Sequence, residues 1–247
     1  MTAGAQAARH LRDLLHLLFP RVCLGCDAVE GLAADGCCRA CRAELDDSFR
    51  QNHCGRCAAT IGAYGAADGA CAKCRAWYWP LTGIARLGPH QGRLRDMLLA
   101  AKYAGRDDLL GPLVGHLAAK LAETDWFDRV EALAAVPTCW HRRVRGRPYL
   151  ATALAGELAR VTGRCDLPLL RRVRGGPSQI GLSRAWRAAN VKGAFRTAPG
   201  VEMNRAVVCL VDDVTTSGST LNECARMLKR AGAAEVFAAV VCKAEPG

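Results

Sequence analysis

The chain has 247 residues, of which 51% are hydrophobic, enough for one packed domain of ordinary size with a small appendage. Its formal net charge of +11 at pH 7 excludes a strongly acidic protein and favours an anionic partner. The excess lies in one segment, because residues 139–196 contain thirteen basic and two acidic side chains. Two kinds of anion fit this segment: a small molecule that carries pyrophosphate, and a nucleic acid.

The first predicted element is an amphipathic helix over residues 5–19, which ends at Pro20 and makes up the first predicted segment, residues 1–20. Its leucines share one face: Leu11, Leu14, Leu15 and Leu18. Arg12 and Asp13 interrupt the apolar run, so it is too short and too charged for a secretory signal or a membrane span. We expect the helix to pack against the rest of the protein, with a membrane-surface helix as the alternative. We therefore expect a cytoplasmic protein without a membrane span.

Cysteines dominate the second predicted segment, residues 21–79, which we interpret as a double zinc ribbon. Eight of them form four Cys-x-x-Cys knuckles: Cys23 and Cys26, Cys38 and Cys41, Cys54 and Cys57, Cys71 and Cys74. A gap of two residues lets both thiolates of a knuckle reach one tetrahedral zinc ion, so eight thiolates make two structural sites. We pair the first knuckle with the second and the third with the fourth; a crossed pairing and an iron–sulfur site are the alternatives. We expect that Cys37, next to Cys38, does not bind zinc; the alternative is that it replaces Cys38 as a ligand.

An aromatic stretch, Trp77-Tyr78-Trp79-Pro80, follows the last knuckle. We interpret it as packing between domains, and stacking on the bases of single-stranded nucleic acid is the alternative. Residues 80–247 then have the composition of a larger α/β domain. The apolar patterns predict strands over 82–87 and 131–136 and helices over 92–103, 107–123 and 152–161. Lys102 closes the first of these helices, either as a solvated charge or as a phosphate contact.

Two basic segments lie in this domain. The first, residues 141–147, follows a predicted strand, where ligands of open α/β sheets bind. We expect Arg142, Arg143 and Arg145 to contact pyrophosphate there, and an exposed basic loop is the alternative. The second, residues 169–179, is basic and then rich in glycine. We interpret its Gly175–Gln179 arm, together with Arg187, as a lid over a phosphorylated substrate, and a surface loop is the alternative.

The segment from Ala206 to Leu221 reads as a buried strand, two adjacent acids, a turn rich in hydroxyl groups, and a helix that starts near Ser219. A second apolar run over 235–242 completes a β-α-β unit. The amino end of a helix after a strand is a phosphate site, because free backbone N–H groups and the helix dipole favour an anion. The two acids suit sugar hydroxyls or magnesium. The alternative is a solvated loop with a helix cap at Ser217 or Ser219.

This segment resembles the phosphoribosyl pyrophosphate (PRPP) signature of type I phosphoribosyltransferases. The whole chain resembles the ComF (ComFC/GntX-like) family in a set of motifs: Phe19-Pro20 before Cys23, Lys102-Tyr103, Val136-Pro137, Arg145-Gly146, Gln179-x-x-Leu182 with Arg187 and Asn190, and Asp212 to Thr220. Two departures are evident. Arg147-Pro148-Tyr149 replaces the Phe-Asn-Gln that usually follows the family's Arg-Gly, and Pro89-His90 stands where the family often has an aromatic residue. The resemblance implies a mostly parallel α/β sheet flanked by helices, after a small double zinc ribbon.

The resemblance also implies that PRPP binds together with magnesium. Asp212 and Asp213 would hold the ribose hydroxyls, directly or through the metal, as the catalytic pair. The 5′-phosphate would lie in the turn made of Thr215, Thr216, Ser217, Gly218, Ser219 and Thr220. Gln179 and Arg187 would belong to the lid. The implied setting is competence and DNA uptake, with possible transfer of phosphoribose to an acceptor that the sequence does not identify.

A non-catalytic module is the alternative function. It would keep the PRPP-type fold and hold single-stranded DNA, or a DNA-translocation partner such as a competence helicase, through the basic segment and the zinc ribbons. The intact pair Asp212-Asp213 favours PRPP binding, because a pure binding module has no need of both acids. The sequence indicates no oligomeric state.

Overall fold

The computed structural model describes residues 21–62, 66–67, 70–75, 79–138, 149–174 and 191–245. Several predicted features lie outside these ranges: the helix over 5–19, the basic loop over 141–147 with Arg142, Arg143 and Arg145, and the lid residues Gln179 and Arg187.

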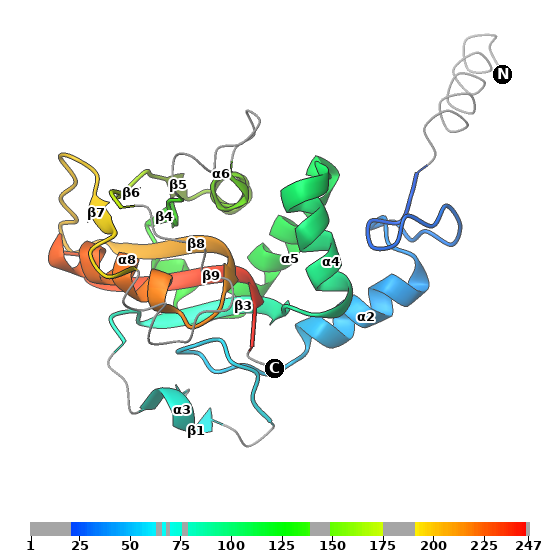
Figure 1. Ribbon diagram of the computed structural model, residues 1–247, viewed down its shortest axis with the longest axis horizontal. Coiled ribbons are helices and arrows are strands. Elements are labelled where there is room, and N and C mark those ends of the chain that lie inside the picture. Colours follow the sequence, from blue (N-terminus) through cyan, green and yellow to red (C-terminus); the bar gives the residue numbers. More distant parts are fainter. Residues whose placement is uncertain are drawn as a thin grey trace, which may run out of the picture.

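A five-stranded parallel sheet forms the centre of the molecule (Figure 1), in the order β3-β9-β8-β4-β5. Its strands are β3 (Gly83–Pro89), β4 (Ala132–Ala135), β5 (Cys165–Asp166), β8 (Val207–Thr215) and β9 (Glu235–Lys243). The two apolar runs predicted from the sequence are β8 and β9, and nearly every residue in them is buried. Strands covered on both faces are typical of parallel sheets, so the predicted α/β class is confirmed.

Helices cover both faces of this sheet. On the first face lie α4 (Gly92–Leu99), α5 (Leu110–Ala122) and α6 (Leu150–Thr162). On the second face lie α8 (Ser219–Arg230) and the two-stranded antiparallel ribbon of β6 (Leu170–Arg172) and β7 (Phe195–Thr197). Strand β8 supplies both cores, because Cys209 and Val211 face the first helices, whereas Val208 and Leu210 face α8.

The predicted helix over 92–103 is in fact two elements. Helix α4 ends at Leu99, and the chain continues in a π-helical turn, η1 (Ala100–Ala104), which stops at Gly105 in the left-handed conformation with φ of 73°. The α4 stripe of Leu94, Met97 and Leu98 is buried, whereas no residue of the turn is. The buried contacts that accompany the regular α-helix therefore end at Leu99. Turns with π-helical hydrogen bonds are frequent at functional sites. A 3-10 turn, η2 (Asp107–Leu109), then leads into α5.

The two cysteine-rich lobes lie on opposite faces of the sheet. The first continues into α2 (Arg39–Phe49), and its Cys41 and Leu45 share the core of α4 and α5. The second contains β1 (Ala66–Ala67), β2 (Ala70–Cys71) and α3 (Ala72–Arg75), and its Ala58 packs in the α8 core. Figure 1 shows the first lobe beside α4 at the right and the second below β3.

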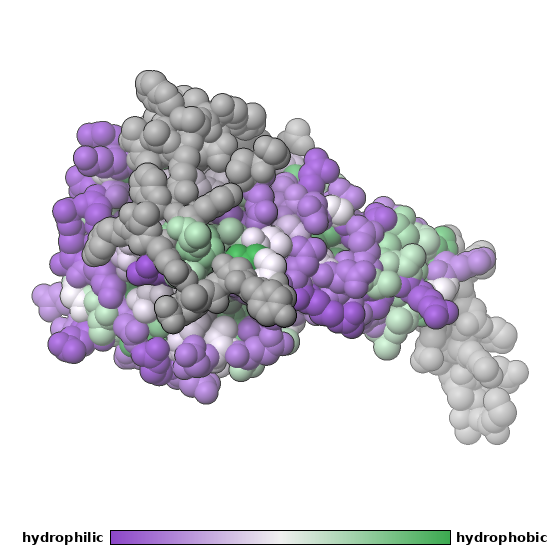
Figure 2. Space-filling model, turned by 90° about the horizontal axis from the view of Figure 1, so that it is seen from below, coloured by the Kyte–Doolittle hydropathy of each residue, from purple (hydrophilic) through white to green (hydrophobic). Residues whose placement is uncertain are grey.

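The surface seen from below is mainly hydrophilic, with apolar residues in small separate patches (Figure 2). Across the described part of the chain, every helix is too short or too polar to span a lipid bilayer.

Candidate functional site

Two buried acids, Asp212 and Asp213, lie at the carboxyl end of β8. The sequence predicted that the strand ends before the two acids, and this is wrong, because Asp212 pairs with Val240 of β9 and Thr215 with Lys243. A long partner strand overrides the low strand propensity of aspartate. Successive side chains of a strand face opposite sides, so the β8 alternation directs Asp212 to the α8 side and Asp213 to the α4 side.

Asp213 forms an ion pair with Lys102 of the π turn, with 2.7 Å between Nζ and Oδ2. The Asp213 side chain is 4% exposed and the Lys102 side chain 18% exposed, so the pair is largely removed from water. The sequence predicted a solvated charge or a phosphate contact for Lys102. The structure shows that Lys102 is paired with Asp213 and is not a solvated charge, whereas the adjacent Tyr103 is exposed. A phosphate contact of Lys102 stays a prediction.

Asp212 has a different environment. Its Oδ1 accepts a hydrogen bond of 2.9 Å from the backbone N–H of Asp213. Burial, together with the negative charge of Asp213, raises the pKa of Asp212 well above its usual value. A buried acid with a raised pKa, next to a second acid at the end of a strand, is typical of functional sites, where a cation or a set of hydroxyl groups completes the environment.

The turn after β8 leads directly into helix α8. Gly218 has a φ of 78° and is the N-cap residue of α8, without a side-chain cap hydrogen bond. The predicted alternative, a cap by Ser217 or Ser219, is therefore not what the structure shows; their hydroxyl groups lie 2.7 Å from each other. The N–H of Ser219 donates to Ser217 Oγ over 3.4 Å, whereas no described residue accepts from the N–H groups of Thr220 and Leu221, which remain available to an anion. Thr216 is exposed, and Ser219 and Thr220 are half-buried, so the turn is open to a ligand.

Two residues that we did not assign to the site support this turn from β9 and β3. Buried Lys243 donates a hydrogen bond from Nζ to the carbonyl oxygen of Thr216. His90 follows β3, and its backbone N–H donates to the carbonyl of Lys243 over 2.7 Å. Burial and the charges of Arg95 and Lys102 lower the pKa of His90. Only the positions of His90 and Lys243 could have indicated their role, because each comes at the end of an apolar strand and both strands end at the same edge of the sheet.

Trp79 packs against the same turn. A methyl group added at Gly218 would lie 2.8 Å from Cζ3 of Trp79, so only glycine fits beneath this ring. Trp79 is buried and belongs to the small core that contains Cys54, Cys71 and Cys74 of the second lobe. The packing interpretation of the aromatic stretch therefore holds for Trp79. The sequence did not predict its contact with the turn.

Both cysteine tetrads fit zinc. The four sulfurs of each group lie within 4.8 Å of one another: Cys23, Cys26, Cys38 and Cys41 in the first, and Cys54, Cys57, Cys71 and Cys74 in the second. Four thiolates at 2.3 Å from one zinc ion in tetrahedral geometry would lie about 3.8 Å apart. The sulfurs of Cys26 and Cys38 are 3.8 Å apart, and those of Cys57 and Cys71 are 3.7 Å apart. The predicted pairing of knuckles is confirmed, and Cys37 is outside both groups.

The first and third knuckles repeat one local structure. The N–H of Asp27 bonds to the carbonyl of Cys23, and that of Ala58 bonds to the carbonyl of Cys54, both over 2.9 Å. Asp27 and Ala58 both adopt a positive φ, of 61° and 60°. Backbone N–H groups also donate to the cysteine sulfurs, as from Cys71 to Cys54 over 3.2 Å. Such donation stabilises thiolates, the form that binds metal.

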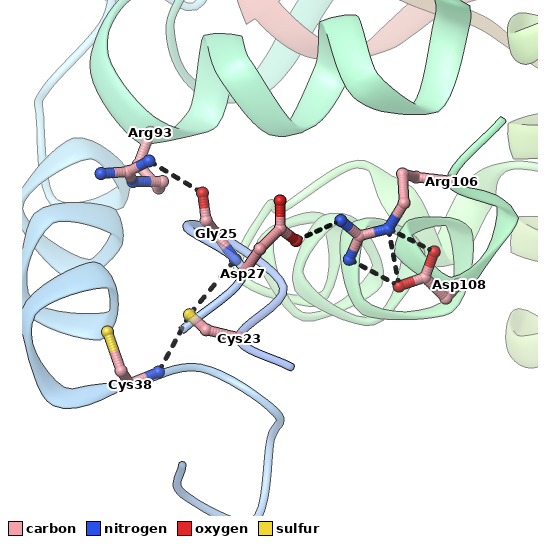
Figure 3. A network of polar contacts seen from close by, with 7 residues as sticks. All are labelled: Cys23, Gly25, Asp27, Cys38, Arg93, Arg106 and Asp108. Atoms are coloured by element: carbon pink, nitrogen blue, oxygen red, sulfur yellow. Dashed lines mark hydrogen bonds and ion pairs between the residues drawn. The ribbon is translucent and has the colours of Figure 1, made fainter. Parts of the chain in front are cut away.

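Arginines attach the first zinc lobe to the segment that contains Lys102. Arg93 of α4 donates to the carbonyl of Gly25 over 2.8 Å, and Arg106 pairs with Asp27 over 2.5 Å (Figure 3). Arg106 also bonds to Asp108, so one guanidinium joins the knuckle to the start of η2. The π turn is therefore held between α4 and a zinc knuckle.

The second zinc lobe is attached to β3. The N–H of Ile84 donates to the carbonyl of Gly55 over 2.8 Å, and fully buried Arg86 donates from Nη2 to Thr60 Oγ1 over 2.7 Å. Each lobe therefore braces one face of the sheet close to the acid pair.

Comparisons with known proteins match this architecture. Residues 14–75 match the double zinc ribbon domain family, and residues 149–246 match the phosphoribosyl transferase domain family. The fold and these matches define a protein in which a double zinc ribbon precedes a phosphoribosyltransferase domain.

The chain is 30% identical to competence protein F of Haemophilus influenzae over 223 residues, which cover 87% of this chain and 93% of that protein. It is 27% identical to the DNA utilization protein YhgH of Escherichia coli K12, over 92% of this chain and 99% of that protein. A solved allosteric regulatory enzyme of purine biosynthesis is also similar, with 23% identity, a TM-score of 0.34, and coverage of 53% of this chain and 25% of that one. The chain belongs to the ComF family, the family of competence protein F.

Proposed function

We propose that this protein binds PRPP with magnesium at the carboxyl ends of β8 and β9, and that it acts in competence and DNA uptake. The observation that carries the proposal is the adjacency of two features. Asp212 and Asp213 are buried at the end of β8, and the turn that follows, Thr216 to Gly218, leads into helix α8, where the N–H groups of Thr220 and Leu221 are open. Carboxylates suit the ribose hydroxyls, and the turn suits the 5′-phosphate.

The residues present fit magnesium. Carboxylate oxygens are preferred ligands of this ion, and Asp212 and Asp213 provide two adjacent buried carboxylates at the end of β8, of which Asp213 is paired with Lys102. Because Asp212 and Asp213 project from opposite faces of the sheet, one of these carboxylates would hold the ion together with PRPP oxygens. When bound, magnesium would neutralise charge on the pyrophosphate group. Arg142, Arg143 and Arg145 are proposed as further pyrophosphate contacts, and Gln179 and Arg187 as lid residues.

Phosphoribosyl transfer is the reaction proposed for this site. An acceptor nucleophile would form a bond to the anomeric carbon of PRPP while the bond to pyrophosphate breaks, and pyrophosphate would leave with the electron pair. The contribution of the protein would be orientation of the ribose by Asp212 and Asp213, and stabilisation of the departing charge by nearby cations. Lys102, which pairs with Asp213, is one described cation beside the acid pair.

Calorimetry tests the proposal. PRPP with magnesium is titrated into the zinc-loaded wild type, into Asp212→Asn/Asp213→Asn, and into Asp46→Asn/Asp47→Asn. The control pair also consists of adjacent acids, but it lies on α2, far along the chain from the proposed site. We expect binding to be lost only in the first variant. Equal heats for all three proteins would refute the site. Release of pyrophosphate on addition of an acceptor would then test transfer.

The basic segment favours a second candidate function, the holding of single-stranded DNA or of a helicase-type partner during DNA uptake. Residues 139–196 carry a net charge of +11, and a PRPP molecule needs only a few of these charges. Salt-dependent binding of an oligonucleotide by the wild-type protein tests this function.

A further inference from the structure

The β6–β7 ribbon has two chemically different faces. Leu170 and Phe195 lie on its inner face, in the core shared with α8. Arg172 lies on the same face, with Cζ 5.4 Å from the ring centroid of Phe195. On the outer face, Arg171 stands directly opposite Arg196 in the antiparallel register, and both are exposed. The alternation of a strand thus separates the ribbon's arginines into an inner one and an outer pair.

The outer pair is an unfavourable arrangement in the isolated protein. Residues directly opposite in an antiparallel pair have Cβ atoms about 5 Å apart, and like charges there are destabilising. Arg196 donates to the carbonyl of its neighbour Phe195 over 2.9 Å, and within the described ranges neither guanidinium forms an ion pair with a carboxylate. The surrounding sequence offers little compensation, because residues 167–201 contain seven basic side chains and no acidic one. An external anion would relieve this repulsion.

Exposed apolar side chains flank the same strand. Leu167, before β6, and Val173, directly after it, are each 42% exposed. They are two of only five large apolar side chains that are exposed in the described part of the chain. A ligand that offers both negative charge and accessible apolar surface matches this composition. Single-stranded DNA has both, because its bases are unpaired, whereas a duplex hides the faces of its bases.

We propose that the outer face of the β6–β7 ribbon, with Arg171, Arg196 and Val173, together with exposed Leu167 in the segment before β6, is a binding surface for single-stranded DNA. Arg171 and Arg196 contact backbone phosphates, and the two apolar side chains contact bases. This proposal rests on the second candidate function, the binding of single-stranded DNA, and names the surface that would perform it. It is separate from the PRPP site, because the outer pair projects from the face of the ribbon that does not pack on α8.

Fluorescence anisotropy of a labelled oligothymidylate tests the surface, with zinc-loaded protein and no PRPP. The test variant is Arg171→Glu/Arg196→Glu. The control is Arg50→Glu/Arg230→Glu, which changes two exposed arginines elsewhere and has the same net charge. We expect the test variant to bind about tenfold more weakly than the control. The slope of log affinity against log salt should also decrease in magnitude by about 1.4, the value expected for the loss of two phosphate contacts to a single strand.

A milder variant guards against misfolding. Arg171→Gln/Arg196→Gln removes the like-charge pair, so we expect it to unfold at or above the wild-type temperature while it still binds DNA more weakly. A merely structural role would lower stability and binding together. PRPP calorimetry on the same variant should match wild type, which separates this surface from the PRPP site.

Four results would overturn the inference. If wild type binds no oligonucleotide, the second candidate function and this surface both fail. If wild type binds but the Arg171/Arg196 variants bind like the control, only the surface fails. Equal affinity for a duplex of the same length would refute base contact. If wild type binds polyglutamate but no DNA, and the Arg171/Arg196 variants lose the polyglutamate binding, the surface would belong to an acidic protein partner.

Discussion

Lys102 and Asp213 form the one described ion pair that connects the π turn to the carboxyl end of β8, with 2.7 Å between Nζ and Oδ2. A second pair, Lys120 and Glu123, has the same separation of 2.7 Å but is 28% and 65% exposed. The two pairs share chemistry and distance and differ in burial. Because solvent screens the exposed pair, whereas removal of one partner from the buried pair leaves an uncompensated buried charge, disruption of the buried pair should cost far more stability.

Double-mutant cycles measure this difference. Lys102→Met leaves the Asp213 carboxylate buried without its cation, and we expect the free energy of unfolding to fall by about 3 kcal/mol. Asp213→Asn in the same background should recover part of the loss, with a coupling energy of about 2 kcal/mol. The control cycle, Lys120→Met with Glu123→Gln, should show a coupling below about 1 kcal/mol. Urea unfolding of zinc-loaded protein gives both values, and additive effects in the buried cycle would contradict the expectation.

The contact between Trp79 and Gly218 predicts a position-specific effect of alanine. Gly218→Ala combines left-handed strain with a clash of 2.8 Å against the ring, so we expect a loss of about 3 kcal/mol in stability. Gly200→Ala is the matched control, because Gly200 has a φ of 74° and nothing within 4 Å of an added Cβ. Strain alone should cost about 1 kcal/mol there. Equal losses in chemical denaturation would show that the ring does not confine the turn.

The cysteine tetrads predict two zinc ions per chain. Cys26→Ser and Cys57→Ser should each retain one ion by mass spectrometry of the acid-digested protein, because each removes a ligand from a different tetrad. Cys37→Ser is the control: Cys37 is buried beside Cys38 but belongs to neither group, so two ions should remain. Loss of an ion in this control would mean that Cys37 is a ligand.

Chelation should have a stronger effect than either single substitution. The lobes hold the π turn through Arg106 and the Gly218 turn through Trp79. We therefore expect removal of both ions to abolish PRPP binding as well as the local structure of the lobes. Retention of full PRPP affinity in metal-free protein would show that the lobes do not organise the site.

His116 predicts a dependence of stability on pH. This side chain of α5 lies 4.8 Å from the ring of Phe49, and burial together with the charge of Arg42 lowers its pKa below the usual 6.5. Below pH 6.5 the unfolded chain therefore binds a proton that the folded chain does not, and the free energy of unfolding falls until the folded-state pKa is reached. His116→Gln should show a smaller fall over this range. Thiolate protonation affects both proteins alike, so parallel curves would contradict the assignment.

Much of the candidate site could be predicted from local sequence. Four knuckles with two-residue gaps define eight thiolates, and tetrahedral zinc requires only that pairs of knuckles meet. Likewise, Gly218 and the hydroxyl residues between a buried strand and a helix define a phosphate-type turn, because its donors come from consecutive backbone groups. In both cases the relevant atoms lie close together along the chain, so their spacing alone determines the chemistry.

Contacts between distant segments were decided only by the tertiary structure. The pairing of β8 with β9 extends the strand through Asp212 and Asp213 and thereby turns the two acids to opposite faces of the sheet. Lys102 then meets one acid, and Trp79 meets the turn that follows them. Register between the ribbon strands likewise places Arg171 opposite Arg196. Each of these relationships depends on strand register and packing between residues far apart in the chain, because a one-residue shift would turn every side chain to the other face.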